Sequence, residues 1–279
     1  MSSSSISIGA FLDTLQQLLA RSRLVTTLAL KIRNQCNAII RKSLAPQGHN
    51  HALNGELWLV ELLGSGLKTV VDVGANTGAW ALSVLGKVPA VDRLIVFEPN
   101  PAAFESLRRN LSGMPSVVYS QKALGDKRGS LSFWCAPDAG ELSSLVKEHA
   151  PRGSTEVRVA VSTLDEEVDR LGVQHIDLLK IDAEGYDFRV ILGSRRLLDE
   201  HRISIIQFEY NEPWRATGST LTHAAAFLEG MGYALFLIKG PGKLERANPE
   251  KYGEYFGYSN YIAVADVPAA IESYIEGRR

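Results

Sequence analysis

The sequence predicts an α/β domain built on a mostly parallel sheet with helices on both faces, preceded by a helical N-terminal extension. Short apolar runs rich in β-branched residues, such as Val70–Val73 and Leu94–Phe97, alternate with stretches of helical periodicity. This alternation is typical of a doubly wound sheet. The first run leads into a glycine-containing turn and the second ends in a carboxylate. Doubly wound folds place such features at a nucleotide-like ligand.

Residues 1–50 form a basic, amphipathic segment that we separate from the α/β domain at residues 51–279. Large apolar side chains recur in it at helical spacing: Phe11, Leu15, Leu18, Leu19, Leu24, Leu28 and Ile32. We expect helix to about Ser43. Six basic residues and one acid give the segment a charge of +5, although the whole chain carries −1. Residues 11–43 could therefore lie on an anionic membrane, contact another subunit, or pack on the rest of the chain.

Composition narrows the class of protein. A chain of 279 residues that is 45% hydrophobic can bury a sizeable core, and a net charge of −1 argues against a nucleic-acid binder. The two cysteines, Cys36 and Cys135, make neither a disulfide framework nor a zinc motif, so a reducing cytoplasm is the simplest setting. No run approaches the roughly 18 apolar residues of a membrane span, and no signal peptide is evident.

The turn after the first strand reads Gly74-Ala-Asn-Thr-Gly78. Glycine lets backbone approach a ligand closely, and the following helix offers free N–H groups, with Asn76 or Thr77 as its expected cap. Asp72 lies inside the strand, where a carboxylate needs a partner. It could orient the glycine turn and hold a ligand's ammonium group, or it could cap nearby backbone.

The second strand ends in Glu98, which lies 24 residues after Gly74. Doubly wound folds place an acid at about this separation to accept hydrogen bonds from ribose hydroxyls. Asn76 replaces the middle glycine that lets a pyrophosphate approach, so we expect a ribose without a diphosphate. S-adenosylmethionine fits both observations. Asn100 and Pro101 predict the start of the next helix.

Further strands and helices follow in order. The expected strands are Ser116–Ser120, with Leu131–Trp134 as a hairpin arm against it, Glu156–Val161, Ile176–Asp182, Ile203–Phe208, Tyr233–Ile238 and Asn260–Val264. Thr163 and Glu166 form a capping box that opens a helix through Leu171. The polar stretch 240–257 is long for a loop in a compact domain, so it is a candidate lid or acceptor surface.

Five motifs together resemble the FkbM family of S-adenosylmethionine-dependent methyltransferases: DVGANTG, FEPNP, KALGD, STLD and LLKIDAEGYD. The resemblance covers residues 54–265. It implies a Rossmann-like class I methyltransferase fold, with a seven-stranded sheet whose last strand runs antiparallel between the fifth and sixth. It also implies O-methylation of a hydroxyl on a sugar, glycan or secondary metabolite. The binding residues for the methyl donor would be Asp72, Gly74, Asn76, Gly78, Glu98 and Ala123, the last lying along the adenine.

Asp182, Glu184 and Tyr186 follow the fourth expected strand, at the edge where ligands bind in such sheets. A hydroxyl acceptor must lose a proton, and Asp182 is the first candidate base, with Glu184 second. Alternatively, Asp182 orients the donor and Glu184 pairs with Lys180. Lys180 needs an acidic partner because it lies inside an apolar strand.

The fifth strand leads into Glu209, Tyr210 and Asn211. Asp182, Glu209 and Asn211 could supply oxygen ligands to Mg²⁺, although the same side chains could equally bind substrate hydroxyls, and we do not favour the metal. Tyr210 and Trp214 could stack on a sugar ring or serve as packing residues.

Two rival functions stay open. A nicotinamide-dependent oxidoreductase is disfavoured by Asn76 in the glycine turn and by the lack of a Tyr-x-x-x-Lys pair after the fourth strand. A non-catalytic relative that binds S-adenosylmethionine would instead hold a partner through the basic N-terminal segment.

Overall fold

The computed structural model describes residues 8–46, 48, 50, 53–136 and 150–276. The chain forms two compact units, Met1–Ser43 and Leu44–Arg279. The first unit holds α1 (Ile8–Ala20) and most of α2 (Arg23–Leu44). Helix therefore extends as expected, but it is interrupted at Arg21 and Ser22. Ser22 begins the second helix, because its hydroxyl accepts the Val25 N–H at 3.4 Å.

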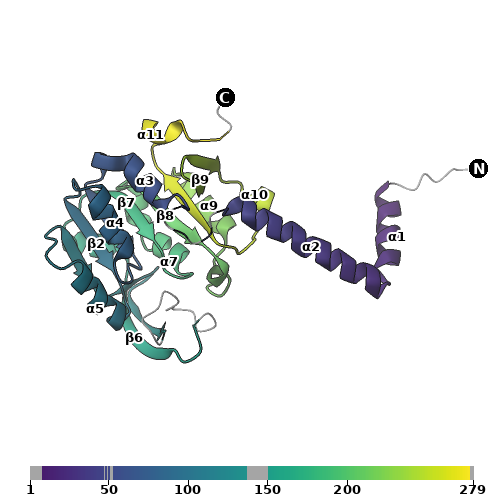
Figure 1. Ribbon diagram of the computed structural model, residues 1–279, viewed down its shortest axis with the longest axis horizontal. Coiled ribbons are helices and arrows are strands. Elements are labelled where there is room, and N and C mark those ends of the chain that lie inside the picture. Colours follow the sequence, from purple (N-terminus) through teal and green to yellow (C-terminus); the bar gives the residue numbers. More distant parts are fainter. Residues whose placement is uncertain (1–7, 47, 49, 51–52, 137–149, 277–279) are drawn as a thin grey trace, which may run out of the picture. The chain divides into compact units, whose positions relative to one another are not determined.

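The second unit is built on an eight-stranded sheet (Figure 1). Its strands, in spatial order, are β10 (Lys243–Arg246), β9 (Ala234–Gly240), β11 (Ser259–Val264), β8 (Ile203–Tyr210), β7 (Ile176–Ile181), β1 (Thr69–Val73), β2 (Arg93–Phe97) and β3 (Val117–Ser120). β11 is antiparallel to both neighbours, while the strands from β8 to β3 are parallel. This order confirms the predicted class I methyltransferase fold. The eighth strand, β10, lies in the stretch expected to be a loop.

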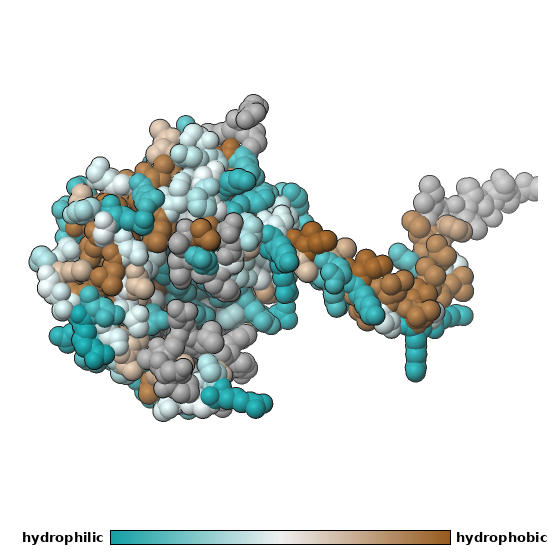
Figure 2. All heavy atoms as spheres, in the orientation of Figure 1, coloured by the Kyte–Doolittle hydropathy of each residue, from teal (hydrophilic) through white to brown (hydrophobic). Residues whose placement is uncertain are grey.

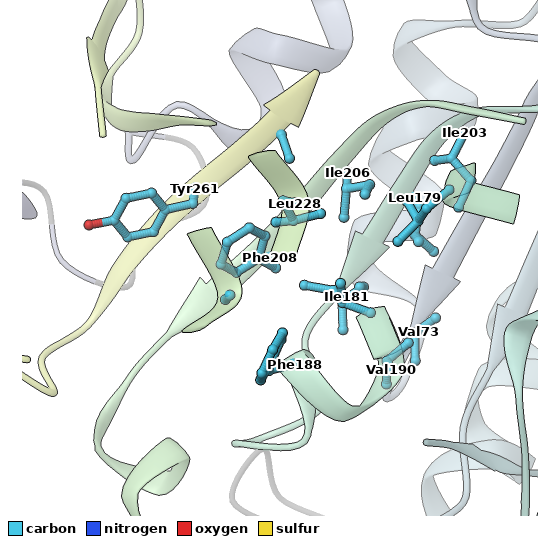
Figure 3. Packing of buried hydrophobic residues seen from close by; sticks show 14 of the residues in the cluster. Val73, Leu179, Ile181, Phe188, Val190, Ile203, Ile206, Phe208, Leu228 and Tyr261 are labelled. Carbon is cyan, nitrogen blue, oxygen red and sulfur yellow. The ribbon is translucent and has the colours of Figure 1, made fainter. Parts of the chain in front are cut away.

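Alternate residues of each strand face opposite layers of helices. Val70 belongs to one apolar cluster and Val71 to the other. One face is covered by α3 (Glu56–Leu63), α4 (Ala79–Lys87), α5 (Pro101–Asn110) and α11 (Ala269–Glu272). The other face is covered by α6 (Leu164–Leu171), α7 (Asp187–Leu192), α8 (Arg195–Asp199) and α9 (Leu221–Gly230). Figure 3 shows the second cluster, where Phe188 of α7 and Leu228 of α9 lie over Ile181 and Phe208.

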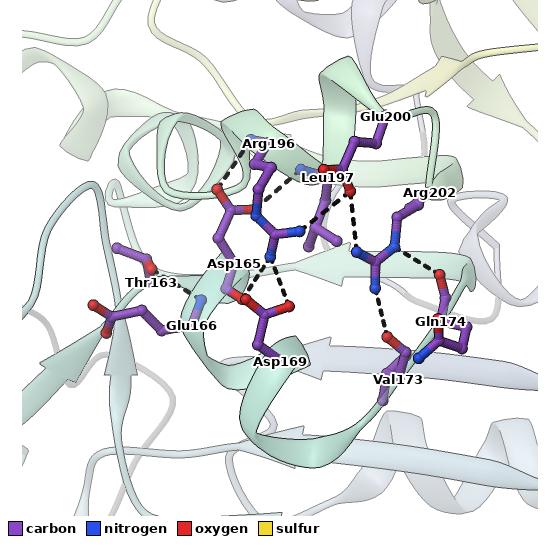
Figure 4. A network of polar contacts seen from close by, with 10 residues as sticks. All are labelled: Thr163, Asp165, Glu166, Asp169, Val173, Gln174, Arg196, Leu197, Glu200 and Arg202. Carbon is purple, nitrogen blue, oxygen red and sulfur yellow. Dashed lines mark hydrogen bonds and ion pairs between the residues drawn. The ribbon is translucent and has the colours of Figure 1, made fainter.

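Polar contacts join α6 to α8 (Figure 4). Both carboxylate oxygens of Asp165 accept backbone N–H groups at the start of α8, from Arg196 at 3.0 Å and Leu197 at 3.1 Å. The Arg196 side chain returns to Asp169 at 2.8 Å. Thr163 accepts the Glu166 N–H at 3.2 Å, which confirms the predicted start of α6.

A smaller sheet has the order β4 (Ala123–Leu124), β6 (Thr155–Ser162), β5 (Gly129–Cys135). The predicted hairpin between residues 131–134 and the third strand is wrong, because β5 pairs antiparallel with β6. This pairing buries Phe133 against Val159 and Val161 in a cluster that also contains Ala123. A β5–β3 pairing would leave that cluster open.

The remaining short elements among the described residues are α10 (Pro249–Tyr252) and two 3₁₀ turns, η1 (Gly64–Gly66) and η3 (Glu212–Arg215). Across the part of the chain that the structure describes, no helix has the length and apolar character required to cross a bilayer.

Candidate active site

The glycine loop, residues 74–78, is fastened between the ends of three strands. The Gly74 and Ala75 N–H groups both donate to the Phe97 carbonyl, at 2.9 and 3.0 Å. The Asp182 N–H donates to the Val73 carbonyl at 2.9 Å. A Cβ at Gly74 would lie 1.9 Å from the Asp182 carbonyl oxygen, and φ there is +79°. Glycine is therefore required for the loop to touch the end of β7.

The start of α4 differs from the expected cap. Gly78, with φ of 88°, is the N-cap, and no side chain caps the helix. The prediction that Asn76 or Thr77 would do so is wrong, because Asn76 takes a left-handed conformation with φ of 47°. The buried Asn76 Oδ1 has no hydrogen-bond partner among the described residues. The loop thus presents uncapped helix N–H groups and a free amide oxygen, which are features that fit a bound polar ligand.

Glu98 joins the end of β2 to the glycine loop. It is 5% exposed, and its two carboxylate oxygens accept the Asn76 and Asn100 N–H groups, each at 2.8 Å. Burial raises the pKa of Glu98 to about 7, although these two donors oppose the shift. Asn100 also caps α5 as predicted, accepting the Ala102 N–H at 3.0 Å. Each Glu98 oxygen keeps a lone pair, so the carboxylate can still accept a ligand hydroxyl.

A row of polar side chains crosses the sheet beneath this edge. Asp72, Lys180 and Gln207 are register partners on β1, β7 and β8. The Lys180 ammonium lies 3.5 Å from Asp72 Oδ1 and 3.2 Å from Asp182 Oδ2, which confirms the expectation of an acidic partner. Burial alone would lower the pKa of Lys180, but the charges of Asp182 and Asp72 raise it above its ordinary value. The ion pair with the fully buried Asp72 fixes the Lys180 ammonium, and Lys180 in turn positions Asp182.

The loop after β7 is held in a strained conformation. Glu184 has φ of 48°, and a Cβ at Gly185 would lie 2.5 Å from Pro213 Cβ. Asp187 fastens the loop by accepting the Gly185 N–H at 3.2 Å. Burial, with a contribution from the Asp182 charge, raises the pKa of Asp187 to about 7. Non-glycine residues with positive φ concentrate at functional sites, and Asn76 and Glu184 both belong to the predicted site.

Glu209 adds a further carboxylate from the end of β8. Burial, followed by the charges of Asp182 and Glu184, raises the pKa of Glu209 well above its ordinary value. Its Oε1 accepts the Asn211 side-chain amide at 2.6 Å. We call Asp182, Glu184, Asp187 and Glu209 the acidic edge.

Two of the magnesium candidates, Asp182 and Glu209, already have polar partners in this structure. Asp182 pairs with Lys180, and Glu209 pairs with Asn211. Within the described ranges, no three His, Cys, Asp or Glu side chains are grouped closely enough to hold a metal ion. The aromatic candidates are packing residues, because Tyr210 and Trp214 are both 0% exposed and Trp214 donates to the Glu209 carbonyl at 2.9 Å.

A polar cluster that sequence reasoning missed lies beside Glu209. Asn260 is the register partner of Glu209, and its amide donates to Glu56 Oε1 at 2.9 Å and to the Tyr258 hydroxyl at 3.0 Å. The Asn54 amide donates to the same hydroxyl at 2.9 Å. These residues are distant in sequence. The sequence contains one sign of the cluster, which is that polar residues stand at the start of α3 and at the start of β11.

Ala123 lies on β4, outside the large sheet. It pairs with Val161 and is 5% exposed. Burial, and then the charge of Glu98, raise the pKa of Cys135 at the end of β5 of the same small sheet.

Residues 72–235, which contain the glycine loop, Glu98 and the acidic edge, match the Methyltransferase FkbM domain. The chain belongs to this family. It is similar to the 2-O-methyltransferase NoeI of Sinorhizobium fredii, with 27% identity over 55% of this chain and 68% of that protein. It is 29% identical to the hexuronic acid methyltransferase AglP of Haloferax volcanii, over 49% of this chain and 54% of that protein. A solved FkbM methyltransferase from Methylobacillus flagellatus superposes with a TM-score of 0.46 and 14% identity, over 70% of this chain and 43% of that one.

The FkbM match makes this chain a methyltransferase, and it favours that class over the nicotinamide-dependent oxidoreductase. It begins at Asp72, the first residue of the predicted site. It ends within β9, before the antiparallel strand β11 that supplies Asn260.

Proposed function

We propose that this FkbM-family methyltransferase transfers the methyl group of S-adenosylmethionine to a hydroxyl of a sugar, a glycan or a secondary metabolite. The observation that carries the proposal is the meeting of the glycine loop, Glu98 and Asp182 at one edge of the sheet. We further propose that residues 51–279 are the catalytic domain and residues 1–50 a separate extension.

The residues of this edge suit the methyl donor. Glu98 would accept the ribose hydroxyls, and the glycine loop, through Gly74, Asn76 and Gly78, would hold the amino-acid end. Asp72 would support that loop through Lys180, and Ala123 would line the adenine. The unpartnered Asn76 Oδ1 and the uncapped start of α4 support this assignment. When bound, the donor supplies an electrophilic methyl group on a sulfonium centre.

The protein's own chemical task is to position the acceptor and remove its proton. Asp182 remains our first candidate base, because Lys180 holds its carboxylate in place and its side chain is 25% exposed. Glu184 is the second, on a loop fixed by Asp187. Glu184 and Glu209 of the acidic edge, which are partly exposed, would also accept hydrogen bonds from further acceptor hydroxyls, which supports a polyhydroxylated acceptor. Relatives named as a 2-O-methyltransferase and a hexuronic acid methyltransferase agree with this choice.

Transfer of labelled methyl from S-adenosylmethionine to a panel of sugars, uronic acids and hydroxylated metabolites tests the proposal. With an acceptor in hand, Asp182→Asn should lower kcat about 10²–10⁴-fold, because a positioned base contributes that much. Glu212→Gln is the matched control, since Glu212 is an exposed acid in η3 on the same edge. Unchanged kcat in Asp182→Asn with a collapse in Glu184→Gln would move the base to Glu184. Transfer to amines alone would contradict O-methylation.

A magnesium-dependent mechanism is disfavoured, because Asp182 pairs with Lys180 and Glu209 accepts a hydrogen bond from Asn211. We expect dialysis against EDTA to leave the transfer rate unchanged. Loss of activity that Mg²⁺ restores would instead assign Asp182, Glu209 and Asn211 as ligands.

A further inference from the structure

The N-terminal unit exposes most of the large apolar side chains found at the protein's surface. Of thirteen exposed large hydrophobic residues within the described ranges, eleven lie between Phe11 and Ile40. Figure 2 shows hydrophobic atoms gathered along both α1 and α2. Scattered surface hydrophobics need no explanation, but such a concentration indicates a binding surface.

Nine of these eleven side chains form one stripe on each helix, while Leu30 and Ile40 lie outside the stripe of α2. In α1 the stripe is Phe11, Leu12, Leu15, Leu18 and Leu19, opposite Asp13 and Gln17. In α2, at about 100° per residue, it centres on Leu24, Leu28, Ile32 and Ile39, opposite Arg23, Asn34 and Arg41. Both helices are therefore amphipathic.

Basic side chains lie beside the apolar stripe of α2. On α2, Lys31 and Lys42 lie along one border of the stripe, and Arg33 lies beyond the other. None of the six basic side chains in residues 1–50 forms an ion pair with a described residue. Long basic side chains at the border of an apolar stripe can reach lipid phosphates while the stripe enters the acyl layer.

Three occupants could cover the stripe, and two fit poorly. A second copy would bring two segments of charge +5 together. The rest of the chain is acidic, at −6, but from residue 44 onward its described surface exposes only Leu53 and Leu82 as large hydrophobics. It therefore lacks an apolar surface to match the nine side chains of the two stripes. An anionic bilayer supplies both negative charge and an apolar layer.

We propose that α1 and α2 bind the surface of an anionic lipid bilayer, with their apolar stripes in the headgroup and acyl boundary. This inference does not depend on the proposed reaction. It makes the chain a peripheral membrane protein.

A polarity-sensitive fluorophore on Cys36 provides the test, because Cys36 is exposed and lies near the α2 stripe between Ile32 and Ile39. Cys135→Ser leaves Cys36 as the single thiol. The matched control carries Cys36→Ser and Asn34→Cys, which moves the label to the polar face. We expect a blue shift for the Cys36 label with vesicles of phosphatidylcholine and phosphatidylglycerol. The shift should be absent with phosphatidylcholine alone, weakened by salt, and small for the control.

Other results would overturn the proposal. A Cys36 label already blue-shifted without lipid would show that the chain covers its own stripe. A lipid-free shift that grows with protein concentration would indicate a second copy. No shift under any condition would show that the stripe stays in water and does not bind lipid.

Vesicle co-sedimentation supplies an independent measurement. Leu28→Gln with Ile32→Gln should reduce partitioning into anionic vesicles at least about tenfold, because two large side chains leave the acyl boundary. Thr27→Gln with Asn34→Gln, on the polar face, should bind like the wild type. Equal loss in both pairs would contradict a role for the stripe.

Discussion

Gly74 illustrates how much of the site is fixed by single residues. From the sequence, a glycine at the end of this strand indicates that the backbone can approach a ligand closely. The sequence cannot predict that the neighbour is the carbonyl of Asp182, because that contact depends on β1 and β7 being adjacent in the sheet. The need for a glycine could be inferred from the sequence, but the backbone atom that it contacts could not.

Substituting Gly74 should therefore be far more damaging than substituting a glycine with free space around it. Gly74→Ala should lower the free energy of unfolding by roughly 3 kcal/mol or more, since the Cβ would overlap backbone and φ is positive. Gly86→Ala is the control, because a Cβ added there would meet no atom within 4 Å and the residue sits inside α4. It should raise stability by about 0.5–1 kcal/mol. Denaturant titration measures both, and equal effects would contradict the packing described.

Lys180 holds two carboxylates, of which the sequence indicated Asp182 as a possible partner but did not indicate Asp72. Lys180→Met should cost about 3–5 kcal/mol of unfolding free energy, because it leaves Asp72 buried without a counter-charge. Adding Asp72→Asn should recover part of the loss, since the uncompensated charge is then gone. Lys127→Met, at an exposed position, should change stability by no more than about 0.5 kcal/mol. If the double variant is no more stable than Lys180→Met, the pairing has no energetic role.

Glu98 predicts a pH dependence of stability. Its pKa is raised from 4.5 to about 7 in the folded protein, so between these values the folded state holds a proton that the unfolded chain has released. The free energy of unfolding should therefore fall as pH rises through this window, by at most about 3 kcal/mol from Glu98. Asp187 acts in the same direction.

Denaturant titrations at about pH 5 and pH 8 test this dependence. Glu98→Gln should show a smaller fall than the wild type, because the amide does not titrate. Glu105→Gln, an exposed acid on α5, should keep the full fall. An undiminished fall in Glu98→Gln would remove Glu98 as its source.

For single helices and strands, most helix caps could be predicted from neighbouring residues, but the partner strand of β5 could not. The caps at Asn100 and Thr163 were predictable because each side chain bonds backbone two or three residues away. The partner of β5 was predicted wrongly, because the choice between β3 and β6 is decided by burial of Phe133, not by sequence distance. The absence of a side-chain cap on α4 was also missed, since Asn76 bends away in a left-handed conformation.

The side chain of Asp165 on α6 holds the start of α8. Asp165→Ala should cost about 1–2 kcal/mol, because α8 loses both acceptors for its first N–H groups. Asp165→Asn keeps one side-chain oxygen, so its unfolding free energy should lie between those of wild type and Asp165→Ala. Thermal and denaturant unfolding measure the series, and an alanine variant as stable as wild type would contradict this capping role.

For the whole molecule, strand order was predictable through the resemblance, and the periodicity of individual strands agreed with it. The edge that gathers the glycine loop, Glu98 and Asp182 was predicted with it. The cluster of Asn54, Glu56, Tyr258 and Asn260 was not, because its contacts span up to 204 residues of sequence. Parallel sheets bring such distant residues to one edge, and only the folded chain shows which ones meet.

Calorimetric titration of S-adenosylmethionine into the full-length protein tests the central claim most directly. We predict micromolar binding to the wild type, binding reduced at least about tenfold in Glu98→Ala, and wild-type binding in Glu105→Ala. The reason is that Glu98 alone of the two acids lies at the glycine loop. Absence of binding to the wild type, or equal affinity in Glu98→Ala, would contradict the assignment of this edge as the cofactor site.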